Sequence, residues 1–385
     1  MSFRIVLFLP AMGLLLCGFA PAVSAQTGLL IGLRARPGPA LPEAYETLWV
    51  VPVGRGVRVR RIPDLLVPTG DGFWRMGTDI SCAVTDREER HRQQLENVWI
   101  KAASPPLVPR SRRDPCEDGL DDDLMSEKPR GSNGTQSGEG RSIFYGAVCY
   151  NEGNTIEFAG NGFFALSSGA EISCGVHPDA LVWPSIQLLR PNSRPLPITD
   201  LLGVKGFEAF QEGIQAELRA DHPPLCAADF RDRVQEGSWK VAPELWWLEH
   251  KEGAWRARGW MDTHRLCGYG FAFSIPIHLP ESVVPHNLLS PDWDYLQRSI
   301  RELRDAASSP SGDMLVALTV EEFLVFLPRG IELGAPVARF RLGWNSAIVM
   351  TQWAQGGTTR LWDRRIARLA GGTAPSPSRS KPKTP

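Results

Sequence analysis

Short apolar runs separated by turn-forming residues dominate the first half of the chain. Residues 46–51 read ETLWVV, and after a Gly-Arg-Gly turn the segment VRVRR at 57–61 alternates apolar and charged positions. Alternation with a period of two is typical of a strand with one buried face. Similar apolar runs between turn residues predict further strands at residues 64–68, 71–77, 97–102, 142–150 and 155–166.

Helical spacing begins in the second half of the chain. An amphipathic helix is predicted over residues 206–219, because apolar side chains recur there at Phe207, Phe210, Ile214 and Leu218. Residues 290–292, Ser-Pro-Asp, then offer an N-cap, a first-turn proline and an acidic first turn. We expect this signal to start a helix whose apolar face carries Trp293, Leu296, Ile300 and Leu303.

Strands are predicted around these helices as well. The stretch at 244–260 reads as a hairpin that turns at 251–253, and a further strand is expected within 268–280. Toward the C-terminus the pattern predicts strands at 314–319, 323–326, 337–341 and 347–352, followed by a short helix at 360–369.

A proline-rich connector at residues 190–198 predicts a boundary between two parts of the chain. We expect a disulfide-stabilised α+β fold, in which a strand-rich half precedes a half with helices on an antiparallel sheet. The strand-rich region spans 26–190 and contains a long loop at 103–142, whereas the mixed region spans 191–370. Residues 371–385 are expected to form a basic, disordered tail.

The first 25 residues have the three parts of a secretory signal. Arg4 precedes an apolar run at 5–20, and residues 23–25, Val-Ser-Ala, suit cleavage by signal peptidase. A retained membrane anchor is disfavoured because prolines and glycines interrupt the run, and bulky leucines before Cys17 disfavour a lipoprotein. We expect removal of 1–25 and export to the periplasm or the extracellular space, without a later transmembrane segment.

Six cysteines remain after removal of the signal. An even number in an exported chain is typical of disulfides, and no C-x-x-C pair suggests a zinc or thioredoxin site. We expect neighbours to pair in order, Cys226 with Cys267 above all, although other connectivities stay open. The expected disulfide residues are Cys82, Cys116, Cys149, Cys174, Cys226 and Cys267.

Composition and motifs exclude several functions. The formal net charge of −1 gives no reason to expect a nucleic-acid partner. The nucleophile elbow of hydrolases, the zinc-protease helix motif, the phosphate-binding loop and the dinucleotide fingerprint are all missing from the sequence. We therefore expect no cofactor and no metal site, and we favour a protein without catalytic activity.

One segment still combines groups that could perform chemistry. In CGVHPD at 174–179, His177 could act as a general base that Asp179 orients. The alternative is a turn in which Cys174 is disulfide-bonded and His177 forms a local hydrogen bond. No accompanying motif supports catalysis, so we favour the turn and keep His177 and Asp179 as candidate catalytic residues.

Two further groups are candidates for binding. Tryptophans in the predicted hairpin could stack on sugars or on a protein, but core packing explains most of them. The arginines at 55, 58, 60 and 61 could meet an anionic wall polymer, but the charged outer face of a half-buried strand is the better explanation. The candidate binding residues are Trp246, Trp247, Trp255, Trp260 and His177.

Residues 155–284 contain pieces in a familiar order: CGVHPDA at 174–180, ITDLLG at 198–203, the helix at 206–219 and the strand at 268–280. This stretch resembles the bacterial extracellular domain found in lysozyme-sensing anti-sigma factors and beside some peptidoglycan deacetylase domains. The resemblance implies a small α+β domain that binds a protein or a wall-derived partner outside the cell. A cysteine replaces the first glycine of the family's Gly-Gly-Ala-His turn, and the chain shows no sigma-binding or deacetylase segment.

Taken together, these features predict a secreted or periplasmic, non-enzymatic binding protein of the bacterial cell envelope. Its partner is expected to be an envelope protein or peptidoglycan. One alternative is a cell-wall hydrolase or related enzyme that uses His177 and a carboxylate. Another is a structural envelope protein without a soluble ligand.

Overall fold

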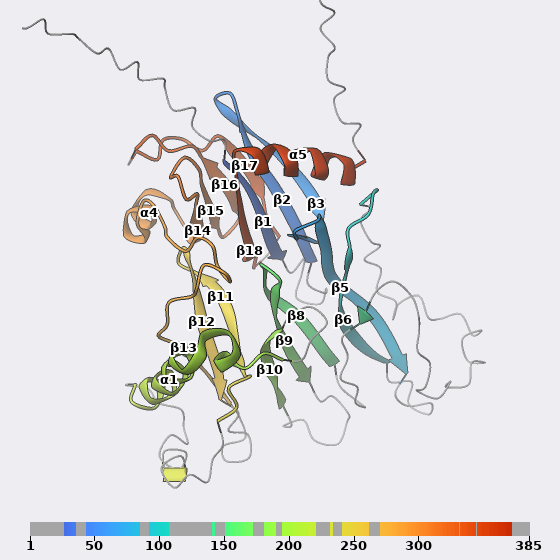
Figure 1. Ribbon diagram of the computed structural model, residues 1–385, viewed down its shortest axis with the longest axis vertical. Coiled ribbons are helices and arrows are strands. Elements are labelled where there is room, and N and C mark those ends of the chain that lie inside the picture. The colour runs from blue at the N-terminus through green and yellow to red at the C-terminus, as the bar shows by residue number, and fades with distance from the viewer. Residues whose placement is uncertain are drawn as a thin grey trace, which may run out of the picture.

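The chain is built mainly from antiparallel sheets. The computed structural model describes residues 27–35, 44–84, 92–107, 141–142, 151–171, 181–189, 195–220, 232–233, 241–261, 270–330, 332–343 and 345–371. Within these residues five antiparallel sheets and three named helices are present (Figure 1). The strand-rich character expected from the sequence is therefore confirmed.

The central sheet joins the two ends of the described chain. Its strand order is β18-β1-β2-β3, and β1 forms antiparallel pairs with both of its neighbours. Thr27, the first residue of β1, lies opposite Gln355, the last residue of β18. A sheet therefore crosses the boundary that the sequence suggested near residue 190. The strands are β1 (Thr27–Ala35), β2 (Ala44–Val53), β3 (Gly56–Pro63) and β18 (Ala347–Gln355).

Both faces of the central sheet are buried. Leu29, Ile31 and Leu33 of β1 pack into the largest hydrophobic cluster, whereas Leu30 packs into a second cluster on the opposite face. Helix α5 (Gly357–Leu369) contributes Ile366 and Leu369 to that second cluster and lies across the sheet (Figure 1). A strand buried on both faces needs a nearly continuous apolar run, which β1 has.

Four further sheets surround this centre. In each of them, strands that are consecutive in the sequence are neighbours in the sheet. The strand orders are β4-β5-β6-β7, β10-β9-β8, β11-β12-β13 and β14-β15-β16-β17. The first two contain β4 (Leu65–Pro68), β5 (Phe73–Val84), β6 (Arg92–Ala102), β7 (Arg141–Ser142), β8 (Asn151–Gly160), β9 (Phe163–Glu171) and β10 (Leu181–Leu189). The last two contain β11 (Trp246–Lys251), β12 (Ala254–Met261), β13 (Phe271–Ile275), β14 (Leu303–Ser308), β15 (Leu315–Thr319), β16 (Glu322–Phe326) and β17 (Ala338–Arg341).

Helix α1 (Ile198–Leu218) contains the helix predicted over 206–219 and starts earlier. The two helical parts meet at Gly203, whose φ of 67° is easily reached by glycine. The C-terminal part packs on β13, where the rings of Phe210 and Phe273 meet edge to face at 5.0 Å. The apolar spacing thus identified the packed part of the helix but not the turn that precedes it.

The helix predicted after the Ser-Pro-Asp signal is shorter than expected and has a different cap. Helix α4 (Trp293–Ser299) has Asp292 as its N-cap, because the Asp292 side chain accepts a 2.8 Å hydrogen bond from the Tyr295 N–H. Ser290 is therefore not the cap. The expectation that Leu303 continues the helical face was wrong, since β14 starts at that residue.

The remaining C-terminal elements agree closely with the sequence pattern. Strands β15 to β18 overlap the four predicted strands, although β18 extends to Gln355. Helix α5 overlaps the predicted short helix and starts earlier, at Gly357. The hairpin β11–β12 also forms as predicted and turns at Glu252 and Gly253, which both have positive φ. None of the described helices has the length and apolar content needed to cross a membrane.

Several sequence expectations concern residues outside those described. These are the signal segment at 1–25, most of the loop at 103–142 and the tail beyond residue 371. The proposed disulfides are outside as well, because only the backbone of Cys82 is described, within β5. The other five cysteines, Cys116, Cys149, Cys174, Cys226 and Cys267, belong to segments that are not described.

Candidate functional site

The candidate catalytic residues are not among those that the structure describes. His177 and Asp179 both fall in the undescribed segment between β9 and β10, as does Cys174. The choice between a catalytic histidine and a disulfide-bonded turn therefore stays a prediction.

The hairpin tryptophans lie mainly in the core. Trp246, Trp247 and Trp255 are 0%, 7% and 3% exposed, and only Trp260 is half-buried. Trp246 Nε1 donates to the Leu196 carbonyl oxygen at 2.8 Å, and Trp255 Nε1 donates to Thr351 Oγ1 at 2.9 Å. These buried indoles join the hairpin to its neighbours, so they present no exposed stacking face.

A buried histidine–carboxylate pair lies beside these tryptophans. His250 Nδ1 in β11 is 2.7 Å from Asp305 Oδ2 in β14, and both side chains are less than 10% exposed. Asp305 Oδ1 also accepts the backbone N–H groups of Gly253 and Ala306, each at 2.9 Å. A general base must reach its substrate. Because this pair is enclosed, its contacts tie the hairpin turn to β14.

Two of the arginines on β3 are already paired with carboxylates. Arg58 Nη2 donates to both oxygens of Asp363 in α5 at 2.7 Å, and Arg61 binds Glu46 on the neighbouring strand. Arg58 and Arg61 also lie on opposite faces of the sheet, because side chains alternate along a strand. Their pairing favours the charged outer edge of a strand over a surface for an anionic polymer.

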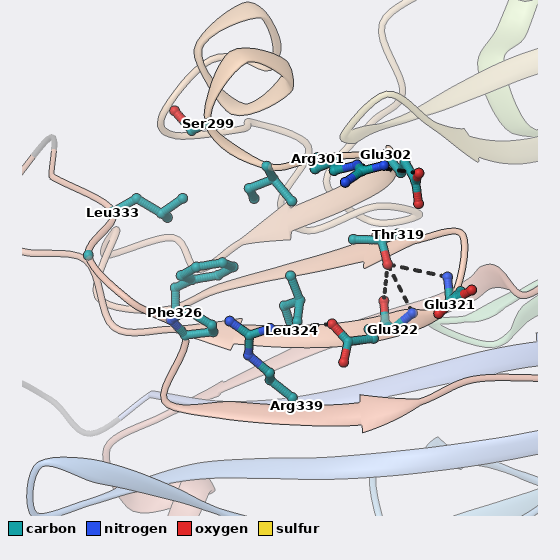
Figure 2. Close-up of a pocket in the computed structure, with 13 residues that line it drawn as sticks. Ser299, Arg301, Glu302, Thr319, Glu321, Glu322, Leu324, Phe326, Leu333 and Arg339 are labelled. Carbon is teal, nitrogen blue, oxygen red and sulfur yellow. Dashed lines mark hydrogen bonds and ion pairs between the residues drawn. The ribbon is translucent and has the colours of Figure 1, made fainter.

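An open groove lies on one face of the β14–β17 sheet, next to α4. Its volume is about 530 Å³, and its walls come from the end of α4, the β15–β16 turn, the loop before β17 and β17 itself. We call this feature the α4 groove. Figure 2 shows its apolar side chains at the centre, with charged pairs on both sides.

The apolar floor of the α4 groove follows from the alternation of β16. Phe323 and Val325 point into the main core, so Leu324 and Phe326 point to the opposite face, where α4 packs. Leu333 from the loop before β17 joins them. Helix α4 has only seven residues and covers part of this face, which leaves the rest open.

Two charged pairs form the rim of the groove. Arg301 Nε lies 3.5 Å from Glu302, and Arg339 Nη1 lies 3.5 Å from Glu322. These separations exceed the usual length of a strong N–H···O bond, and exposed pairs of this kind contribute little to stability. Thr319 Oγ1 holds the acidic side of the rim by accepting the backbone N–H groups of Glu321 and Glu322 at 3.3 and 2.9 Å (Figure 2). The guanidinium groups therefore keep donors for a ligand.

Sequence reasoning did not identify the α4 groove. Its residues come from five short segments between residues 299 and 339, and no single segment contains a recognisable motif. The exposed Val320 and Val337, 50% and 38% exposed, flank it. The only available signal was the alternation of charged and apolar residues in EEFLVF and ARFR.

Comparison with known proteins adds no assignment. No protein-family model matches the chain, and no curated protein matches its sequence at a significant level. Among the described residues no three His, Cys, Asp or Glu side chains are grouped so that they could hold a metal ion.

Proposed function

We propose that this chain is an exported binding protein of the bacterial cell envelope and that it holds a protein partner at the α4 groove. The observation that carries the proposal is the combination of an apolar floor with a charged rim on an open face. Binding surfaces typically combine a desolvated apolar centre with a polar border. The groove has both and contains no histidine or cysteine.

The position of β1 supports the exported part of the proposal. The expected cleavage after Ala25 lies just before Thr27, where β1 begins and where the side chain is 0% exposed. Removal of residues 1–25 would therefore leave the central strand intact. Cleavage two or three residues later would delete part of β1 and expose the core.

The family resemblance supports the same proposal from another part of the chain. It covers residues 155–284, which include the α1 helix and strands β11 to β13, and it implies an extracellular binding domain. The α4 groove follows this region in the sequence. We propose that the resembling region provides the framework and that the groove provides the contact surface.

Site-specific cross-linking in the native envelope tests this function. A photo-reactive residue replaces Val337 at the groove or Val53, which is 52% exposed at the end of β2 and does not line the groove. We expect one discrete protein to be captured from position 337 and not from position 53. Purified, that protein should bind the mature chain.

A matched pair of blocking variants sharpens the test. Ser299→Trp fills the end of the groove, whereas Gln297→Trp places the same bulk on an exposed position of α4 that does not line it. Only Ser299→Trp should prevent capture. If the mature chain sediments with insoluble peptidoglycan and Ser299→Trp does not reduce this sedimentation, the result would contradict the proposal of a protein partner. Wall lysis by the purified chain would instead support the hydrolase.

A further inference from the structure

We infer that the partner contributes an extended acidic segment that adds to β17 as a new antiparallel strand, with an apolar side chain in the α4 groove. This inference rests on the proposed function and specifies the chemistry of its ligand. Strand addition to an open sheet edge is a recurrent mode of peptide recognition, in which backbone hydrogen bonds give affinity and side-chain pockets give specificity.

The first observation is the open edge. β17 is the last strand in the order β14-β15-β16-β17, and in the described part of the chain no strand pairs with its outer side. Leu342 donates its backbone N–H to the Glu321 carbonyl at 2.9 Å, on the β16 side. Because backbone groups alternate in direction along an antiparallel strand, those of Arg339 and Arg341 point outward. Both residues can therefore bond a new strand.

The second observation is the charge that this edge presents. Arg339 and Arg341 are exposed, whereas Ala338 and Phe340, which alternate with them along β17, are half-buried. Arg339 lines the groove, and Arg341 lies on the same face two residues along. An added strand therefore places two alternate side chains opposite two arginines. Carboxylates at these positions form favourable cross-strand pairs.

The same charges argue against a second copy of this chain as the added strand. Pairing two β17 edges would bring arginines of one copy opposite arginines of the other. Like charges directly opposite each other are destabilising, and charged edge strands are a known means of preventing self-association. The edge is thus suited to an acidic segment and unsuited to its own copy.

The groove supplies the third contact. Leu324 lies directly across from Arg339, and Phe326 and Leu333 extend the apolar floor toward the start of β17, on the side of Arg339 away from Arg341. An antiparallel segment meets Arg341 first, then Arg339, then the floor. From its N-terminus to its C-terminus, the segment should therefore place an acidic residue, a second acidic residue and an apolar residue on the groove face. These three residues occupy every second position of the segment.

A synthetic peptide tests the inference directly. The probe is a fluorescent peptide with the order Thr-Glu-Thr-Glu-Thr-Leu-Thr, and its binding to the mature full chain is followed by fluorescence anisotropy at low salt. We expect the charge-reversed double variant Arg339→Glu, Arg341→Glu to bind at least about tenfold more weakly. A peptide with Lys in place of both Glu should then prefer the double variant. Unchanged melting temperature of the variant confirms that it folds.

Backbone methylation separates strand addition from simple charge attraction. N-methyl groups on the two Glu residues of the probe remove donors that face β17, whereas N-methyl groups on the Thr residues that flank the second Glu remove donors that face solvent. Only the first change should abolish binding. The inference would be overturned if the two methylated peptides bound equally well. It would also be overturned if the peptide of reversed sequence bound as tightly as the probe, or if the double variant bound the probe as tightly as the parent chain.

The outcome for the inference is distinct from that for the proposed function. In one outcome, a partner is captured from position 337 and this capture is lost with Ser299→Trp, while the acidic probe does not bind. That result rejects strand addition and leaves the binding function in place. Absence of both rejects both. Binding of the probe by the parent chain, with the expected losses, supports the inference.

Discussion

His250 and Asp305 are joined by a 2.7 Å hydrogen bond across the interface between the β11–β12 hairpin and β14. The His250 ring also meets the Trp255 ring edge to face at 4.8 Å, so the pair is enclosed by the same core that holds the tryptophans. Asp305 satisfies two backbone N–H groups in addition to the imidazole. One carboxylate therefore fixes the hairpin turn, the histidine and the start of β14.

The first prediction concerns this carboxylate. Asp305→Ala leaves a buried imidazole and two buried N–H groups without their acceptor, so the free energy of unfolding should fall by about 3 kcal/mol. Asp294→Ala, an exposed acidic residue in the first turn of α4, should cost less than about 1 kcal/mol. Urea unfolding followed by tryptophan fluorescence measures both. A similar loss of unfolding free energy in both variants would show that the buried pair stabilises the fold no more than an exposed acidic residue does.

The second prediction concerns pH. His286 Nε2 is buried and has no hydrogen-bond partner in the described structure. Burial lowers the pKa of His286 below its ordinary value of 6.5, and hydrogen bonds with the backbone of Ser308 and Leu288 only partly oppose this. Between the lowered pKa and 6.5 the unfolded chain binds more protons than the folded chain. The stability that His286 supports is therefore complete above 6.5 and is lost as the pH falls toward the folded pKa.

Urea unfolding between about pH 5 and 8, the interval in which histidine usually titrates, measures whether stability falls as the pH falls. The parent chain should lose stability as the pH decreases through this interval, and His286→Gln should flatten that part of the curve. His278→Gln is the matched control, because it removes an exposed histidine from the same loop region. An unchanged slope in the His286 variant would locate the pH response elsewhere.

Local signals explain which elements could be predicted. The β11–β12 hairpin combines alternating residues with Glu252-Gly253 at the turn, and both residues have the positive φ that such turns need. Strand β1 lacks alternation because both of its faces are buried, and its apolar run follows the expected signal segment directly. Nothing local distinguishes such a run from other buried segments.

Long-range pairing explains what could not be predicted. β14 contains Asp305, a poor strand residue in isolation, and its burial depends on His250, which is 55 positions away in the sequence. The α4 groove depends on β17 being the edge of its sheet, which is a property of strand order. The four hairpin tryptophans were recognised as a group, but only their burial distinguishes a core from a binding face.

The third prediction concerns the close contact between α1 and β13. A Cβ atom at Gly213 would collide with the Ser274 carbonyl oxygen and would lie 2.8 Å from the Phe273 ring. Gly213→Ala should therefore push the helix from the sheet and lower the free energy of unfolding by about 1–3 kcal/mol, despite the better helix propensity of alanine. The exposed neighbour Glu212→Ala should change it by less than about 0.5 kcal/mol. A stabilised Gly213→Ala variant would mean that the contact is looser than described.

The fourth prediction tests how the hairpin is attached to the central sheet. Trp255 of β12 donates its indole N–H to Thr351 Oγ1 of β18 at 2.9 Å, and both residues are buried. Thr351→Val leaves the indole N–H without an acceptor and should cost about 1–3 kcal/mol, whereas Trp255→Phe removes both the donor and part of the ring. Since each substitution already breaks the same bond, the double variant should lose about 1 kcal/mol less than the sum of the single losses. Chemical unfolding of all four proteins measures this coupling, and strict additivity would show that the bond does not hold the hairpin to the sheet.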